Sequence, residues 1–163
     1  MDHMDAPAQT PWLTEPQQRI WRAFLGANTV LMDRLDRDLR TDHDLSMAEY
    51  EILVRLSEAP DRSIRMAELA AAVAHSRSRI THTISRMEKD GLVFRGQCST
   101  DGRGVSAVLT DEGFAVLERA AHTHVTGVHT HLVDHASDEE LEVIGRVMQR
   151  ILDDLDPQGT RSV

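Results

Sequence analysis

A cluster of arginine, serine and threonine residues between positions 75 and 103 offers the most specific chemistry in the chain. Arginine can pair with guanine through two hydrogen bonds, and Ser, Thr and His side chains can donate to bases or phosphates. Their pattern is a short helix followed by a glycine-rich hairpin, which suits a major-groove reader with a minor-groove wing. We expect DNA contacts from ten side chains: Arg65, Ser76, Arg77, Ser78, Arg79, Thr81, His82, Arg86, Arg95 and Arg103.

The distribution of charge agrees with a local nucleic-acid surface. The 163-residue chain has a formal net charge of −9, yet residues 60–110 contain eight basic and five acidic residues. Salt screens charges beyond about 8 Å, so phosphate binding depends on local clusters more than on net charge. Lys89 is the only lysine, and the remaining cations are arginines, whose planar fork suits bases and phosphates.

The reading residues need a helix to position them, and the sequence predicts one over residues 76–90. Ile80, Ile84 and Met87 recur at helical spacing and form one apolar face. If that face packs into the protein, the polar and basic side chains point outward. A short alanine-rich helix over residues 66–73 precedes this helix after a tight turn. Two short helices in this order predict a helix-turn-helix.

A hairpin is predicted directly after the second helix. Gly91 stands where a helix end commonly takes a left-handed conformation. Residues 93–95 and 105–109 predict two strands, and three glycines lie in the loop between them. Arg103, flanked by two of these glycines, suits a narrow minor groove. The polar helix and the hairpin together are a more specific signal than a helix-turn-helix pattern alone.

Further helices are predicted on both sides of this module. Capping boxes at Thr14–Gln17, Ser46–Glu49 and Ser137–Glu140 predict three helix starts. Apolar residues at helical spacing extend the first helix to about residue 40, and Thr110 can cap another helix over about 111–135. The expected fold is therefore mainly α-helical with a small β-hairpin wing.

The stretch from Ser76 to Val93, followed by Asp101-Gly-Arg103 and Val108-Leu-Thr110, resembles the multiple-antibiotic-resistance regulator (MarR) family. The resemblance in helix order extends from about residue 15 to 155. It implies a transcriptional regulator, usually a repressor, that binds a pseudo-palindromic operator as a homodimer. It also implies that Arg103 enters the minor groove and that Asp101 is its structural partner, which could pair with Arg86 or Arg95.

The resemblance divides the chain into a winged helix-turn-helix embedded in a helical dimerisation frame. We expect a disordered tail over 1–13, a dimerisation helix over 14–45, the winged helix-turn-helix over 46–110, dimerisation helices over 111–156 and a tail over 157–163.

A small-molecule effector is a further implication, because ligands in this family often bind between the dimerisation helices and the winged part. Aromatic and methionine side chains could hold a planar ring, and an arginine could meet a carboxylate. The alternative is that the apolar candidates are simply core residues, which we favour for each taken singly. The candidate residues are Trp21, Phe24, Met47, Tyr50 and Arg55.

Histidines suggest a second, metal-responsive alternative. Five of the nine histidines fall within residues 122–135, and His131 and His135 would share a helical face and could chelate one zinc ion. A complete site needs further ligands, and solvated or hydrogen-bonded histidines are the simpler interpretation. We therefore expect no metal and no cofactor.

Other function classes have weaker signals. A winged helix can also serve as a protein-interaction module, although such a module has no need of a wing-tip arginine. An enzyme is the weakest option, since no phosphate loop, nucleophile elbow or acid pair is evident. No apolar run approaches the roughly 18 residues of a membrane span, and the acidic N-terminus lacks a secretory signal, so we expect no membrane partner and a cytoplasmic location. The single cysteine, Cys98, has no partner for a disulfide within the chain and is taken as incidental.

Overall fold

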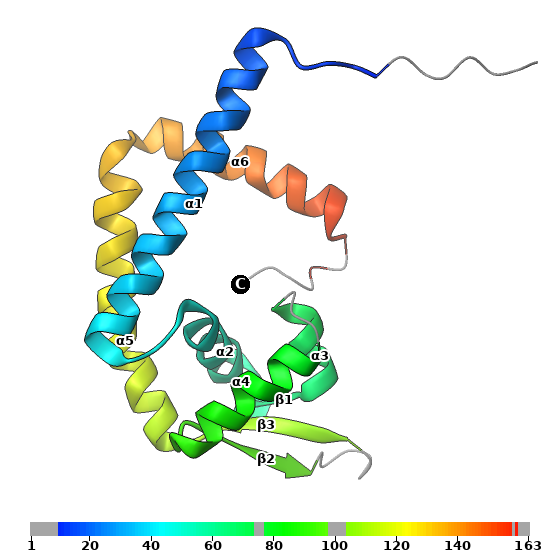
Figure 1. Cartoon of the computed structure of the whole chain (residues 1–163), viewed down its shortest axis with the longest axis vertical. Coiled ribbons are helices and arrows are strands. Elements are labelled where there is room, and N and C mark those ends of the chain that lie inside the picture. Colours follow the sequence, from blue (N-terminus) through cyan, green and yellow to red (C-terminus); the bar gives the residue numbers. More distant parts are fainter. Residues whose placement is uncertain (1–9, 74–76, 98–103, 158, 160–163) are drawn as a thin grey trace, which may run out of the picture.

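The computed structural model describes residues 10–73, 77–97, 104–157 and 159, and this part of the chain is mainly helical (Figure 1). Its elements in chain order are α1 (Glu15–His43), α2 (Met47–Glu58), the 3₁₀ turn η1 (Pro60–Arg62), β1 (Ser63–Arg65), α3 (Met66–Ala72), α4 (Arg77–Lys89), β2 (Val93–Gln97), β3 (Val105–Leu109), α5 (Asp111–His131), the 3₁₀ turn η2 (Val133–His135) and α6 (Asp138–Leu155). The predicted mainly α-helical fold with a small β wing is confirmed.

All three predicted capping boxes are formed at the starts of α1, α2 and α6. In each box a Ser or Thr side chain accepts a hydrogen bond from the third helical residue, whose side chain accepts one from the cap backbone. Helix α1 extends three residues beyond the predicted end and stops where Asp44 adopts a left-handed φ of 53°.

The sheet has one more strand than the sequence predicted. Strand β3 lies in the centre, with β1 and β2 antiparallel on its two sides. Ala107 of β3 is opposite Ile64 of β1 and Arg95 of β2. Strand β1 was missed because three residues are too few for an alternating pattern to be recognised.

The hydrophobic core lies between α2, α3, α4 and β3, in the part of the molecule that spans residues 46–110 and is here called the winged half. Residues of α1 and α5 pack against the same core. The largest fully buried side chains are Leu39, Leu45, Ile52, Leu53, Leu56, Leu69, Ile80, Ile84 and Met87. Burial of one such side chain contributes roughly 1.5–3 kcal/mol, so this cluster holds the three short helices on the sheet.

The first turn of α5 is fastened to the turn that follows α4. The Thr110 hydroxyl accepts a hydrogen bond from Gly113 N at 2.9 Å and donates to Gly91 O at 2.7 Å, while Thr110 N donates to Leu92 O at 3.1 Å. A Cβ at Gly113 would lie 2.1 Å from Leu92 O, so only glycine allows this approach. Gly91 itself has the left-handed φ of 73° that its position predicted.

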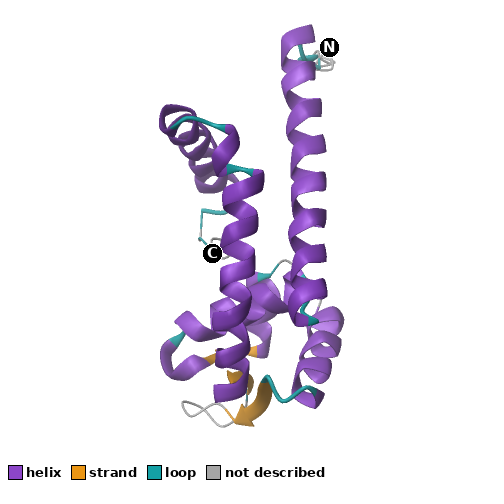
Figure 2. Cartoon of the chain, turned by 90° about the vertical axis from the view of Figure 1, so that its left-hand side faces the viewer, coloured by secondary structure: helices purple, strands orange, loops and turns teal. Residues whose placement is uncertain are grey.

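The C-terminal half of α1 packs against α5. The N-terminal half of α1 projects away from the winged half (Figures 1 and 2). Figure 2 shows α6 standing apart from α1. No residue of α6 is buried within the chain, and its exposed apolar side chains are Val143, Ile144, Ile151, Leu152 and Leu155. None of the described helices is both long enough and apolar enough to span a membrane.

Candidate nucleic-acid interface

Helix α4 is anchored in the core by the apolar stripe that the sequence predicted. Ile80, Ile84 and Met87 are almost completely buried, at exposed fractions of 1%, 0% and 0%. On the other side of the helix, Thr81 and His82 are exposed. The same stripe that fixes the helix therefore leaves a polar face turned to solvent, as a major-groove reader requires.

Several of the predicted DNA contacts lie next to, or outside, the residues that the structure describes. Arg77, Ser78 and Arg79 form the first turn of α4, where a helix offers backbone N–H groups and the positive end of its dipole to a phosphate. Ser76, Asp101 and Arg103 lie outside the described residues, as does Cys98.

Arg95 joins the wing to α4. Its backbone N–H donates to Glu88 Oε1 at 2.8 Å, and its guanidinium forms an ion pair with the same carboxylate. The guanidinium also donates to Thr81 O at 3.1 Å and to Ser85 Oγ at 2.9 Å. Arg95, a predicted DNA contact, therefore also links strand β2 to three residues of α4.

Arg86 is paired within the protein as well. Its Nε and Nη2 atoms lie 2.8 and 2.7 Å from Glu49 Oε1, although its side chain remains 51% exposed. The pairing of Arg86 or Arg95 with Asp101 lies outside the described residues, and the partners that the structure shows are Glu49 and Glu88. The local sequence pattern identifies Glu49 only as a helix cap, because its ion-pair partner is 37 residues away.

Arg65 and Arg62 lie on the strand side of the module. Arg65 is exposed at the end of β1, opposite Ser106, and immediately precedes α3. The guanidinium of Arg62 lies 4.2 Å from the centroid of the Phe114 ring and 3.2 Å from Asp111 Oδ1. Arg62, which the sequence did not single out, fixes the turn before β1 onto the start of α5.

The predicted effector residues do not form one pocket within a single chain. Trp21 and Phe24 stack on each other in the projecting half of α1, at 51% and 42% exposure. Asp36, whose carboxylate accepts from Met47 N at 2.8 Å, is fifteen residues further along α1, or roughly 22 Å from Trp21. Within one protomer the five candidates therefore do not come together, and Trp21 and Phe24 are exposed instead of belonging to its core. The effector site itself stays a prediction.

The remaining candidates stay together on α2. Tyr50 is buried and its ring lies against His124 of α5, with ring centroids 4.6 Å apart. Arg55 is largely buried and donates to Glu51 Oε1 at 3.1 Å, while Met47 packs against the core.

Where α2 meets α5, the imidazole of His124 beside Tyr50 is partly removed from water. Burial lowers its pKa below the ordinary value of 6.5. Its Nδ1 atom is buried without a hydrogen-bond partner among the described residues. Desolvation raises the pKa of Tyr50 beside it.

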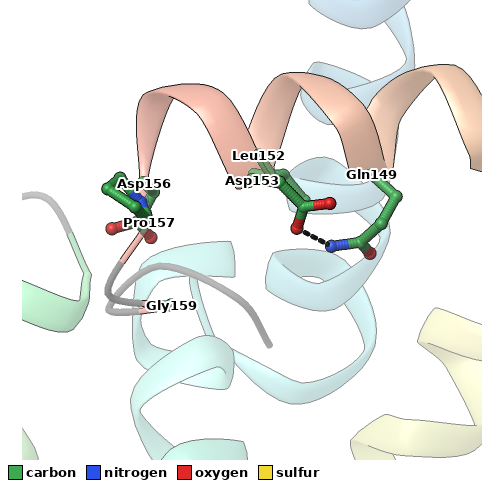
Figure 3. A pocket seen from close by; sticks show the side chains of 6 residues that line it. All are labelled: Gln149, Leu152, Asp153, Asp156, Pro157 and Gly159. Carbon is green, nitrogen blue, oxygen red and sulfur yellow. Dashed lines mark hydrogen bonds between the residues drawn. The ribbon is translucent and has the colours of Figure 1, made fainter.

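A surface hollow of about 220 Å³ lies elsewhere, at the end of α6 (Figure 3). Gln149 Nε2 donates to Asp153 Oδ1 at 2.8 Å along its rim. Its lining contains none of the predicted effector residues: Gln149, Leu152, Asp153, Asp156, Pro157 and Gly159.

The prediction that His131 and His135 share one helical face is wrong. Helix α5 ends at His131, Leu132 leaves helical geometry with φ −130° and ψ −60°, and His135 belongs to the 3₁₀ turn η2. The i,i+4 relation that would place two imidazoles over one ion is therefore lost. Among the described residues, no three histidine, cysteine or acidic side chains gather as a metal site.

Comparison with known proteins agrees with this geometry. Residues 43–104, which hold α2, the helix-turn-helix and β2, match the model of the MarR family. Sco3205, a MarR family transcriptional regulator from Streptomyces coelicolor solved in complex with DNA, is 41% identical with a TM-score of 0.84, covering 90% of this chain and 95% of that one.

Two curated proteins are similar over most of their length. The regulator PecS of Dickeya dadantii is 29% identical over 76% of this chain and 77% of its own. The repressor YetL of Bacillus subtilis is 30% identical over 66% of each chain. With the exposed polar face of α4 and the β wing in place, the chain belongs to the MarR family of DNA-binding transcriptional regulators, which are not enzymes.

Proposed function

We propose that the protein is a homodimeric repressor that binds a pseudo-palindromic operator in duplex DNA and releases it when a small molecule binds. The observation that carries the proposal is the anchoring of α4. Three buried residues hold one side of this helix in the core, and Thr81 and His82 are presented on the exposed side. The DNA-bound state of Sco3205 supports the DNA part, and the similarity to the repressor YetL supports repression.

Exposed apolar side chains support a dimer. The projecting half of α1 carries Trp21, Phe24 and Leu25, and α6 carries Ile151 and Leu155, all well exposed in the single chain. Apolar patches of this kind usually mark an interface. In this proposal residues 14–45 and 111–156 form the dimer frame, and residues 46–110 bind DNA. A symmetric dimer would place its two α4 helices about one helical turn of DNA apart, roughly 34–36 Å.

The wing completes the proposed interface. Strands β2 and β3 are antiparallel, Arg95 in the middle of β2 is tied to α4, and Arg103 falls in the sequence between the two strands. An arginine there could enter the minor groove beside the major groove that α4 occupies.

Selection of bound duplexes from a random pool tests the DNA part. The expected result is a pseudo-palindrome with half-sites centred about 10 base pairs apart. Arg103→Ala should weaken binding and make its salt dependence less steep, by about one unit of log–log slope for one lost phosphate contact. Arg146→Ala, which removes a cation from the polar face of α6, is the matched control and should bind normally. Unselective binding by the wild-type protein would contradict the proposal and favour a protein-interaction module.

The effector part has a separate test. The junction of Tyr50 and His124 joins the DNA-binding half to a frame helix, and its buried Nδ1 could accept or donate a hydrogen bond to a ligand. Small carboxylic acids, phenols and metal ions should be screened for release of the selected operator. Release by an organic molecule that is weakened in Tyr50→Phe or His124→Gln supports this site, whereas release unaffected by both variants contradicts it.

A further inference from the structure

One buried carboxylate joins the start of α2 to the reading helix. Glu49 Oε2 accepts hydrogen bonds from the Ser46 N–H at 2.9 Å and the Ser46 hydroxyl at 2.6 Å. Glu49 Oε1 accepts a hydrogen bond from Nε of Arg86 at 2.8 Å, and Nη2 of the same guanidinium lies 2.7 Å from this oxygen in an ion pair. The side chain of Glu49 is only 6% exposed. The two oxygens therefore have different roles, because Oε2 caps α2 and Oε1 holds α4.

The same turn is bound from α1. Met47 N donates to Asp36 Oδ1 at 2.8 Å, and Arg40 Nε donates to Asp36 Oδ2 at 2.6 Å. Burial alone would raise the pKa of Asp36, but the hydrogen bonds from Met47 and Arg40 and the charge of Arg40 outweigh it and lower the pKa. Asp36 is therefore held as a carboxylate, and α1 is joined to the turn whose next residues hold α4.

The Arg86 pair restricts a motion that the apolar stripe leaves open. Ile80, Ile84 and Met87 line up along α4 and fix its position, but non-directional apolar contacts resist small rotations about the helix axis only weakly. The charge-assisted hydrogen bond from Arg86 Nε and the ion pair from its Nη2 meet on one nearly buried oxygen, and such a contact has a defined direction. A rotation of α4 would leave the Glu49 charge buried without its partner, which is strongly unfavourable.

We propose that Glu49 is a positioning residue for DNA recognition, which acts through Arg86 to set the rotation of α4 and hence the direction of its reading face. Arg86 then makes its main contact with Glu49 and is not itself a reader of DNA. This role rests on the proposed function, because it presupposes that α4 enters the groove. It also gives a physical route by which a shift of α1 against α2 reaches the DNA.

Glu49→Gln separates the two roles of the carboxylate. Glutamine can keep the capping box, as Gln17 already does at the start of α1. It cannot cap Ser46 with its one oxygen and also offer a second anionic oxygen to Arg86. The variant should keep α2 intact while it releases Arg86.

The sign of the effect then distinguishes a positioning role from direct contact. If Arg86 is a DNA contact that Glu49 restrains, Glu49→Gln frees a cation, removes a negative charge and strengthens operator binding. If Glu49 positions α4, operator binding weakens despite the loss of negative charge. We expect an operator affinity about two- to thirtyfold weaker, the range for a coupling residue. Affinity for random duplex and its salt slope should stay unchanged, because phosphate contacts are kept.

Arg86→Lys and Arg86→Gln provide an independent comparison. Arg86→Lys keeps a cation beside the buried Glu49 carboxylate, whereas Arg86→Gln removes it, so circular dichroism must first show that Arg86→Gln folds. Lysine replaces arginine well as a point charge near a phosphate but cannot make the same two-pronged bond. We expect both variants to lose as much operator affinity as Glu49→Gln, and the double variant Glu49→Gln/Arg86→Gln to lose no more than either single one.

Glu140→Gln, the same change in the capping box of α6, is the matched control and should bind the operator normally. Wild-type affinity in Glu49→Gln, or full retention of affinity in Arg86→Lys, would overturn the role of Glu49 while leaving the proposed function intact. Failure of the wild-type protein to select any operator would instead overturn the proposed function and this role with it.

Discussion

The imidazole of His124 lies against the ring of Tyr50, with ring centroids 4.6 Å apart and an angle of 35° between the planes. Tyr50 belongs to α2 and His124 to α5, so this contact joins the proposed DNA-binding part, residues 46–110, to a helix of the proposed dimer frame. Desolvation lowers the pKa of His124, which keeps the ring neutral in the folded protein.

This lowered pKa predicts a loss of stability in acid. The unfolded chain takes up a proton on His124 near its ordinary pKa, about 6.5, before the folded protein does. The contribution of His124 is therefore fully present above that pH and is lost as the pH falls toward the lower folded-state pKa, by at most about 1.4 kcal/mol per pH unit. Urea unfolding of His124→Gln between pH 7 and 5 should show a shallower pH dependence than wild type.

His122→Gln is the control for that experiment, because His122 lies on the same helix with an exposed side chain. Its unfolding free energy should follow the wild-type pH dependence. Equal slopes for all three proteins between pH 7 and 5 would mean that His124 is as easily protonated in the folded state as in the unfolded chain.

Gly113→Ala should strongly destabilise the protein. The added Cβ would meet Leu92 O at 2.1 Å and a methyl group of Leu109 at 2.9 Å, so the first turn of α5 would have to move off the turn after α4. Overpacking of this kind costs about 1–3 kcal/mol and can cost more. The measurement is the urea midpoint, with the slope of the transition checked for a change in cooperativity.

Gly145→Ala makes the same chemical change where there is room. Apart from the adjoining residues and the backbone of its own helix, nothing lies within 4 Å of a Cβ built at Gly145 in α6. Alanine there should raise the unfolding free energy by about 0.5–1 kcal/mol, because glycine loses more conformational freedom in a helix. The two substitutions should therefore have opposite effects on stability. Stabilisation by Gly113→Ala as well would show that helical propensity outweighs the close contact with Leu92.

The parts of the fold that the sequence predicts correctly are those that depend on residues close together in the chain. The stripe of Ile80, Ile84 and Met87 placed α4 and its exposed face, and three capping boxes placed the starts of α1, α2 and α6. Both signals depend on residues three or four positions apart, so a single sequence contains them in full.

Non-local contacts account for what was missed. The Glu49–Arg86 pair spans 37 residues, and the stop of α5 at Leu132 has no proline or glycine to mark it. The exposure of Trp21 and Phe24 has a similar cause, since a helical pattern cannot tell a core of the same chain from an interface with a second one.

His82 is the side chain on α4 for which a base-reading role is most directly testable, because it is exposed on the side of the helix opposite the buried stripe of Ile80 and Ile84. His82→Ala should relax the preference for one base pair in each half-site, at a cost of about 1–3 kcal/mol per lost contact. Lys89→Ala, at the other end of the helix, should weaken all duplexes alike if it affects binding. Competition between operators with single substitutions separates the two patterns. A uniform loss in His82→Ala would assign His82 to the DNA backbone.

Ile151→Glu tests the dimer that the proposed operator geometry requires. Ile151 is 45% exposed in the single chain and lies on the apolar stripe of α6, so a charge there would be buried without a partner if two chains pair through this helix. Light scattering should then show a monomer, or a dimer weakened by at least about tenfold. Operator binding should weaken and become concentration-dependent, because each monomer reads only one half-site.

Arg146→Glu introduces the same side chain on the opposite, polar face of α6 and reverses a charge as well. It should leave the dimer intact, which separates an interface effect from a general effect of acidity on the helix. Circular dichroism should show that both variants stay helical, since glutamate is a good helix former. A stable Ile151→Glu dimer with normal operator affinity would place the subunit contact elsewhere than on the α6 stripe and would remove the main support for α6 as part of the dimer frame.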